Sequence, residues 1–131
     1  MTDHRRRSVI AVVDDDQGSV ESLESLLDSA DYEVRVFSTA TALLESGEMP
    51  ALDGLISDIA MPLMDGFELA RAVQKARPGL PVILVTGRPD SLHQSPSGVP
   101  GHYRVFKKPF DGQELLMAVA RMLQTPRPPR P

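Results

Sequence analysis

The fold of this chain is decided by one stretch, Gly54-Leu55-Ile56-Ser57-Asp58-Ile59-Ala60-Met61-Pro62-Leu63-Met64-Asp65-Gly66. A short apolar run within it ends at a single carboxylate, Asp58, after which Pro62 and Gly66 turn the backbone. An apolar run bounded by turn residues predicts a buried strand. Open α/β sheets bind their ligands in the crevice above the carboxyl ends of the strands, which is where this pattern places Asp58. We therefore take Asp58 as the centre of a candidate site.

Three other short apolar runs also end in polar side chains. They are residues 8–13, followed by Asp14-Asp15-Asp16; residues 82–85, followed by Thr86-Gly87; and residues 105–106, followed by Lys107-Lys108-Pro109-Phe110. If the four predicted strands lie parallel in one sheet, their carboxyl ends meet at the same edge. The sequence then predicts a site that gathers an acid cluster, a hydroxyl and an ammonium around Asp58.

Helical patterns separate the predicted strands. Apolar residues between positions 20 and 30 recur at three- and four-residue steps, as they do on one face of a helix. Residues 34–37 alternate as a strand near the sheet edge does, and the strand from 103 to 107 is the last. After the strand at 34–37, Ser38 or Thr39 can cap a short helix, which Gly47 can end before the strand that leads to Asp58.

Two further aspartates are interpreted as helix caps. Asp65 with Glu68 has the spacing of a capping box, and Asp111 with Glu114 repeats it before the last helix. The chain thus alternates five strands with helices. This order predicts an α/β fold, a doubly wound parallel sheet with right-handed crossovers and helices on both faces.

The segment from Arg88 to Gly101 breaks the alternation. Prolines and glycines leave no window in it long enough for a stable helix; they are Pro89, Pro96, Gly98, Pro100 and Gly101. We expect this segment to be mostly irregular and mobile, so that the fourth helix is atypical or missing.

Length and composition exclude several classes of protein. The 131 residues fit one domain, placed at 8–124 between a mobile tail at 1–7 and a disordered Pro/Arg-rich tail at 125–131. There is no cysteine, which excludes disulfides and zinc–thiolate sites and suits a reducing, cytoplasmic compartment. A formal charge of −4 argues against nucleic acid binding. No apolar run approaches the roughly 20 residues of a membrane span, so no membrane insertion is expected.

The strand-end residues favour phosphoryl chemistry. The carboxylates of Asp14, Asp15 and Asp58 repel one another when they are close, so a cation is expected between them. Mg²⁺ prefers oxygen ligands and is usually held by one or two carboxylates plus a phosphate. A carboxylate such as Asp58 can accept a phosphoryl group, whose charge the metal, an ammonium and a hydroxyl neutralise. Lys108 and Thr86 supply the last two groups.

With these residues, the sequence resembles the receiver domain of two-component response regulators over residues 8–124. The matching positions are the acid pair Asp14 and Asp15, the phosphorylated aspartate Asp58, the hydroxyl residue Thr86, and the lysine Lys108 before Pro109-Phe110. The resemblance implies a flavodoxin-like sheet of strand order 2-1-3-4-5.

The resemblance also implies how the site binds its metal. Asp15, Asp58 and the backbone carbonyl of Ala60 would bind Mg²⁺ directly, with Asp14 acting largely through water. The Lys108–Pro109 peptide bond would be cis.

The function that the resemblance implies is signal transduction by phosphoryl transfer. A histidine kinase or histidine phosphotransfer protein would phosphorylate Asp58, and a downstream protein would receive the signal. The chain would catalyse only its own phosphorylation and dephosphorylation, so it would not be an enzyme in the ordinary sense. We expect a single-domain regulator that is a monomer or a weak dimer.

Two features depart from the family pattern. The family commonly has Tyr or Phe three residues before its lysine, where this chain has Val105, with Tyr103 and Phe106 out of register. The fourth helix also lacks a sequence signal. We therefore expect the signal to leave the site mainly through the adjoining loop.

Two alternative functions remain open from sequence. A magnesium-dependent phosphohydrolase of the haloacid dehalogenase type could use Asp14-Asp15-Asp16 as its Asp-x-Asp motif. Such enzymes prefer Thr where this chain has Gly18, and they need a further acidic pair after the lysine, where Asp111 and Glu114 are expected caps. The second alternative is a receiver fold that serves only as a docking module and is not phosphorylated.

Overall fold

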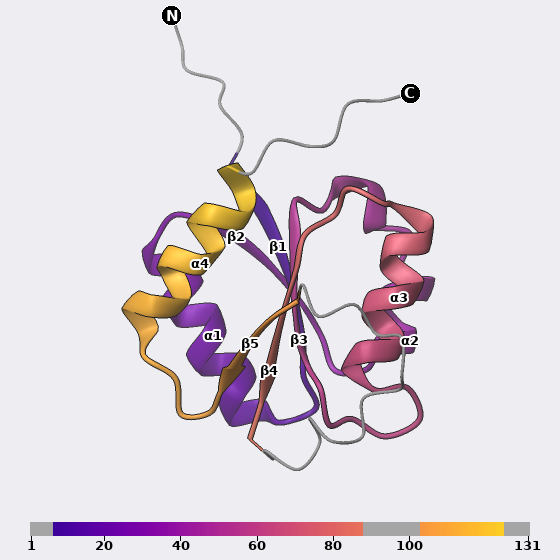
Figure 1. Cartoon of the computed structure of the whole chain (residues 1–131), viewed down its shortest axis with the longest axis horizontal. Coiled ribbons are helices and arrows are strands. Elements are labelled where there is room, and N and C mark those ends of the chain that lie inside the picture. Colours follow the sequence, from indigo (N-terminus) through magenta and orange to yellow (C-terminus); the bar gives the residue numbers. More distant parts are fainter. Residues whose placement is uncertain (1–6, 88–102, 125–131) are drawn as a thin grey trace, which may run out of the picture.

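The chain forms one parallel sheet between two layers of helices, seen in a computed structural model that describes residues 7–87 and 103–124 (Figure 1). The elements in chain order are β1 (Val9–Val13), α1 (Gln17–Ser29), β2 (Glu33–Phe37), α2 (Ala40–Glu45), the 3₁₀ helix η1 (Met49–Ala51), β3 (Gly54–Asp58), α3 (Gly66–Ala76), β4 (Val82–Thr86), β5 (Arg104–Lys107) and α4 (Gly112–Gln124). The segment 88–101, expected to be irregular and to replace the fourth helix, lies outside the described residues, as do the two tails apart from Arg7.

The sheet has the predicted topology. Its strands lie in the order β2-β1-β3-β4-β5, and all four pairings are parallel. The register pairs Val13 of β1 with Ser57 of β3, and Asp58 of β3 with Val85 of β4. The residues that follow β1 and end β3 and β4 therefore lie along one edge of the sheet.

Helices α1 and α4 cover one face of the sheet, and α2 and α3 cover the other (Figure 1). Because side chains alternate along a strand, Ile10 and Val12 of β1 pack beneath α1 and α4, whereas Ala11 and Val13 pack toward α2 and α3. The central strands β1, β3 and β4 are buried along their whole length, as their near-continuous apolar runs predict. The partly exposed β2 is an edge strand, as its alternation predicts.

Short polar side chains fix where the helices begin. Asp16, Thr39 and Asp65 each accept a hydrogen bond from the backbone N–H three residues on, at the starts of α1, α2 and α3. The Glu68 side chain completes the capping box with Asp65, and Asp111 accepts bonds from two N–H groups at the start of α4. The predicted caps are confirmed. The cap at Asp16 is not among the predicted ones, because a run of three aspartates does not show which of them caps the helix.

The elements are short, and their bounds differ little from the predicted ones. β1 begins at Val9 rather than Ser8, β2 at Glu33 rather than Val34, and β5 at Arg104 rather than Tyr103. Helix η1 was not predicted. Among the residues that the structure describes, no helix has the length and apolar character needed to cross a membrane.

Candidate functional site

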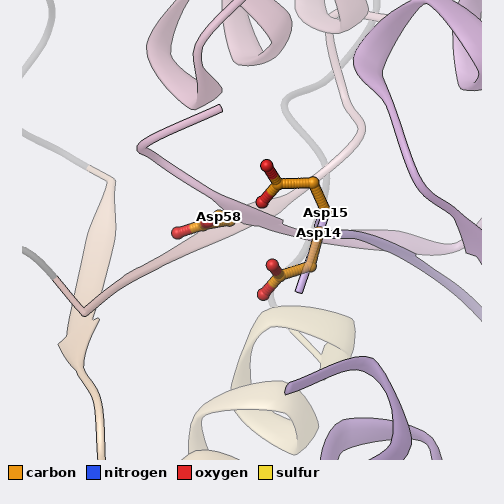
Figure 2. A group of neighbouring side chains, drawn as sticks. All are labelled: Asp14, Asp15 and Asp58. Atoms are coloured by element: carbon orange, nitrogen blue, oxygen red, sulfur yellow. The ribbon is translucent and has the colours of Figure 1, made fainter. Parts of the chain in front are cut away.

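Three carboxylates meet at the carboxyl ends of β1 and β3. Asp14 and Asp15 follow β1 directly, and Asp58 is the last residue of β3. One oxygen from each lies within 4.8 Å of the others, and Figure 2 shows all three side chains projecting to the same side of the strand ends. Asp14 and Asp58 are buried, whereas Asp15 is exposed. The strand ends thus gather the acid cluster that the sequence predicts.

The Asp58 carboxylate is short of compensating partners. The residue is 6% exposed, and its Oδ1 atom is buried without a hydrogen-bond partner. Burial, together with the negative charge of Asp14, raises the pKa of Asp58 to about 6; the Lys108 ammonium and the Ala60 backbone N–H oppose this rise less strongly. A buried carboxylate oxygen without a hydrogen bond favours either a proton or a bound electrophile or cation.

Lys108 places its ammonium group beside this cluster. Its Nζ donates a hydrogen bond to Asp14 Oδ2 at 2.8 Å and lies 3.8 Å from Asp58 Oδ1. The sequence predicted that Lys108 would face the nucleophile, and the structure adds that Asp14 is its direct partner. Asp14 and Lys108 are 94 residues apart, so no local pattern indicated this contact.

The remaining predicted residues lie at the same edge of the sheet. Thr86 is the fully buried last residue of β4, and its backbone carbonyl accepts a hydrogen bond from the Lys108 N–H at 2.8 Å. That bond fixes the backbone of Lys108 next to the backbone of Thr86. Ala60 follows β3 two residues after Asp58 and is partly buried. The Lys108–Pro109 bond is cis, as the resemblance implied.

Gly66 packs the start of α3 directly against the backbone of Asp58 and Ile59. A Cβ atom at this position would lie 2.4 Å from the Asp58 carbonyl oxygen and 2.8 Å from the Ile59 Cα, so any side chain would force the two elements apart. The Gly66 N–H also donates to the Ile59 carbonyl at 2.9 Å. Sequence analysis recognised Gly66 only as a turn residue, and missed that it holds the loop against β3.

The cluster fits a hard divalent cation. Three carboxylates and one ammonium leave excess negative charge at a partly buried position, and the buried Oδ1 of Asp58 accepts no hydrogen bond. Carboxylate oxygens at this spacing are the ligands that Mg²⁺ prefers in proteins. Asp14, Asp15 and Asp58 are therefore the described residues able to hold such an ion.

Asp16 does not belong to the cluster. Its Oδ2 accepts hydrogen bonds from the Ser19 N–H at 3.3 Å and from the Ser19 hydroxyl at 2.8 Å, as the cap of α1. The haloacid dehalogenase alternative would need Asp16 as a working carboxylate of an Asp-x-Asp motif. That alternative therefore gains no support from the structure.

Sequence comparison identifies the family of the protein. The profile of the response regulator receiver domain matches residues 10–120. The chain belongs to the response regulator receiver domain family. The response regulator protein TmoT of Ectopseudomonas mendocina is 34% identical to this receiver domain over 119 residues, covering 91% of the chain and 54% of TmoT. The DNA-binding transcriptional regulator NtrC of Bradyrhizobium sp. is 34% identical over 118 residues, covering 90% of the chain and 25% of NtrC.

A solved structure agrees with this assignment. The signal receiver domain of an HD domain-containing protein from Pseudomonas fluorescens Pf-5 superposes with a TM-score of 0.82 at 31% identity, covering 95% of this chain and 92% of that one. The receiver domain spans about half the length of TmoT and a quarter of NtrC. Receiver domains of response regulators interact with kinases and are not in themselves an enzyme family.

Proposed function

We propose that this receiver domain accepts a phosphoryl group on Asp58 from the phosphohistidine of a histidine kinase or histidine phosphotransfer protein. The observation that carries the proposal is the buried Asp58 Oδ1, which accepts no hydrogen bond, lies 3.8 Å from Lys108 Nζ and stands next to two further carboxylates. An oxygen in this position is a nucleophile whose charge the fold has not already neutralised.

The chain's own residues have distinct parts in the transfer. An Asp58 oxygen attacks phosphorus, a P–O bond forms, and the P–N bond to the donor histidine breaks, with its electron pair leaving on the nitrogen. Lys108 can shift from Asp14 toward the phosphoryl oxygens, since it already lies 3.8 Å from Asp58. Thr86 would supply a hydroxyl to the same oxygens. Hydrolysis of the acyl phosphate by water then regenerates Asp58, so the domain catalyses only its own phosphorylation and dephosphorylation.

The proposed metal is Mg²⁺. Asp15, Asp58 and the Ala60 backbone carbonyl would hold it, with Asp14 acting largely through water. When bound, the ion supplies charge neutralisation for the phosphoryl oxygens and for the crowded carboxylates.

The test is phosphorylation with a small phosphodonor. The wild-type domain, incubated with Mg²⁺ and acetyl phosphate, should gain the mass of one phosphoryl group, and Asp58→Asn should abolish the gain. Asp111→Asn is the matched control, because Asn caps a helix as well as Asp and this carboxylate caps α4 and is not one of the three clustered carboxylates. Phosphorylation of Asp58→Asn at the wild-type rate would show that another group is the acceptor.

The wider role follows from the same proposal. The domain would act in the cytoplasm as a monomer or weak dimer, receive phosphate from a kinase or phosphotransfer protein, and pass the signal to a downstream protein. The chain's formal charge of −4 supports a protein rather than a nucleic acid as its direct partner.

A further inference from the structure

The loop between β3 and α3 contains a strained turn centred on Leu63. The Met64 N–H donates to the Pro62 carbonyl at 2.8 Å, and Leu63 between them has a φ of +71°. A bond across three residues with positive φ at the centre defines the rarer of the two γ-turns, which is strained for a residue with a side chain. Glycine would adopt this conformation without that steric cost.

The Leu63 side chain is almost fully exposed, so its packing does not offset the strain of the turn. It is 98% exposed, against 65% for Met117 and 39% for Val36, the other large exposed apolar side chains in the described part of the chain. Single exposed apolar residues are common on protein surfaces, so exposure alone decides nothing. An apolar side chain that is fully exposed on a strained backbone points instead to a role outside the fold.

The turn is anchored on both sides. Met61 and Met64 on either side of it pack against the hydrophobic core beneath α2 and α3. The capping box of Asp65 and the close contact of Gly66 with Asp58 fix the end of the loop. A side chain presented on a preorganised turn loses little conformational entropy when it binds.

The position of the turn indicates which partner it meets. Leu63 lies five residues after Asp58, in the loop that leaves the carboxyl end of β3 (Figure 1). Asp58 itself is recessed, with 6% of its surface exposed. A protein that brings a phosphohistidine to Asp58 must therefore cover the surrounding loops, whereas a small phosphodonor need not touch them.

We propose that Leu63 is an apolar docking residue for the protein phosphodonor, and that it inserts into an apolar pocket beside the donor histidine. This inference rests on the proposed function, since it requires a protein donor for Asp58. The Leu63 side chain should contribute to recognition of protein donors only.

The test compares two donors and two substitutions. Leu63→Gly removes both the side chain and the strain, and Leu63→Asn keeps a residue that tolerates positive φ while replacing the apolar group by an amide. Acetyl phosphate should phosphorylate both variants at the wild-type rate. The protein probe is a panel of purified, autophosphorylated histidine kinases, from which those that phosphorylate the wild-type domain are used.

With these kinases, both variants should lose about ten-fold or more in kcat/KM, chiefly through KM, since a buried leucine is worth that much in affinity. Val36→Thr, which like Leu63→Asn replaces an exposed apolar side chain by a polar one of nearly the same volume, lies on edge strand β2 and should behave as wild type. Unchanged transfer to Leu63→Gly and Leu63→Asn would overturn the proposal.

Three other outcomes would also count against it. A change in self-association of the Leu63 variants without a change in transfer would assign the residue to contact between copies. Failure of every kinase to phosphorylate a wild-type domain that acetyl phosphate does phosphorylate would remove the protein donor. Failure of acetyl phosphate with the wild type would instead refute the proposed function itself.

Discussion

Two clusters of charged side chains in this domain solve the same electrostatic problem differently. On edge strand β2, Arg35 lies between two carboxylates, with Nη2 2.6 Å from Glu33 Oε2 and Nη1 bonded to Glu48 Oε1. At the strand ends, one ammonium faces three carboxylates, and Asp58 Oδ1 has no hydrogen-bond partner. The first cluster is about one-third exposed and locally satisfied, and the second is mostly buried and unsatisfied.

The difference teaches how a binding site is distinguished from a structural ion pair. Water shares the charge of the exposed β2 cluster, so its geometry is complete without a ligand. The strand-end cluster lacks that help, and burial raises the pKa of Asp58 to about 6. A cluster that the protein leaves short of positive charge is one that a cation or an electrophile can complete.

The largest expected effect concerns the metal. Asp15→Ala should weaken Mg²⁺ binding by about ten-fold or more, because too few hard ligands then remain to offset dehydration of the ion. Chemical shifts of amides near Asp58 during Mg²⁺ titration give the measurement. Glu48→Gln, which removes a carboxylate from the β2 cluster, is the control and should leave affinity unchanged. Equal affinity in Asp15→Ala and the wild type would place the metal elsewhere.

A second effect concerns stability without metal. Asp58→Asn should raise the free energy of unfolding at pH 7.5 by about 1–3 kcal/mol in Mg²⁺-free buffer, because it removes a buried carboxylate held against Asp14. Urea denaturation measures the change. Added Mg²⁺ should stabilise the wild type and narrow the difference.

The pH dependence gives this second prediction its sign. The folded pKa of Asp58 is raised from 3.8 to about 6, so between these values the folded state holds a proton that the unfolded state has lost. Wild-type stability should therefore fall, relative to Asp58→Asn, as pH rises from about 4 to about 6, and the difference should then level off. A constant difference between the two proteins across that window would mean that Asp58 is not the titrating group.

The smallest effect belongs to the satisfied cluster. Arg35→Gln should leave the urea midpoint of unfolding almost unchanged, since partly exposed ion pairs are screened by water and salt. It should leave Mg²⁺ binding and phosphorylation of Asp58 unchanged. A large fall in the urea midpoint of Arg35→Gln would show that the two clusters are not as different as their exposure indicates.

Most of the fold was predictable because its signals are local. The buried strands read as apolar runs, and Asp65 and Asp111 cap helices at the spacings that capping requires. The candidate site was predictable for a related reason. Once the strands are known to be parallel, their carboxyl ends must meet, and Asp14, Asp58 and Thr86 are brought to one edge.

Contacts that long side chains make between distant parts of the chain could not be predicted from the sequence. The Lys108–Asp14 bond is one such contact. Arg77 is another, since its Nη1 donates to the carbonyls of Met49 and Leu52 at 2.6 Å and so holds the unpredicted helix η1. The strain at Leu63 was also hidden, because a leucine carries no signal for positive φ.

The bond between Lys108 and Asp14 also affects how the domain is made on the ribosome. Synthesis delivers β1 and β3, with their three carboxylates, well before the lysine that lies 94 residues beyond Asp14. A nascent sheet lacking β5 gathers negative charge without its ammonium, and repulsion opposes that partial assembly. The missing counter-charge arrives only with Lys108, directly after β5, so the domain should complete its sheet only once nearly all of it has emerged.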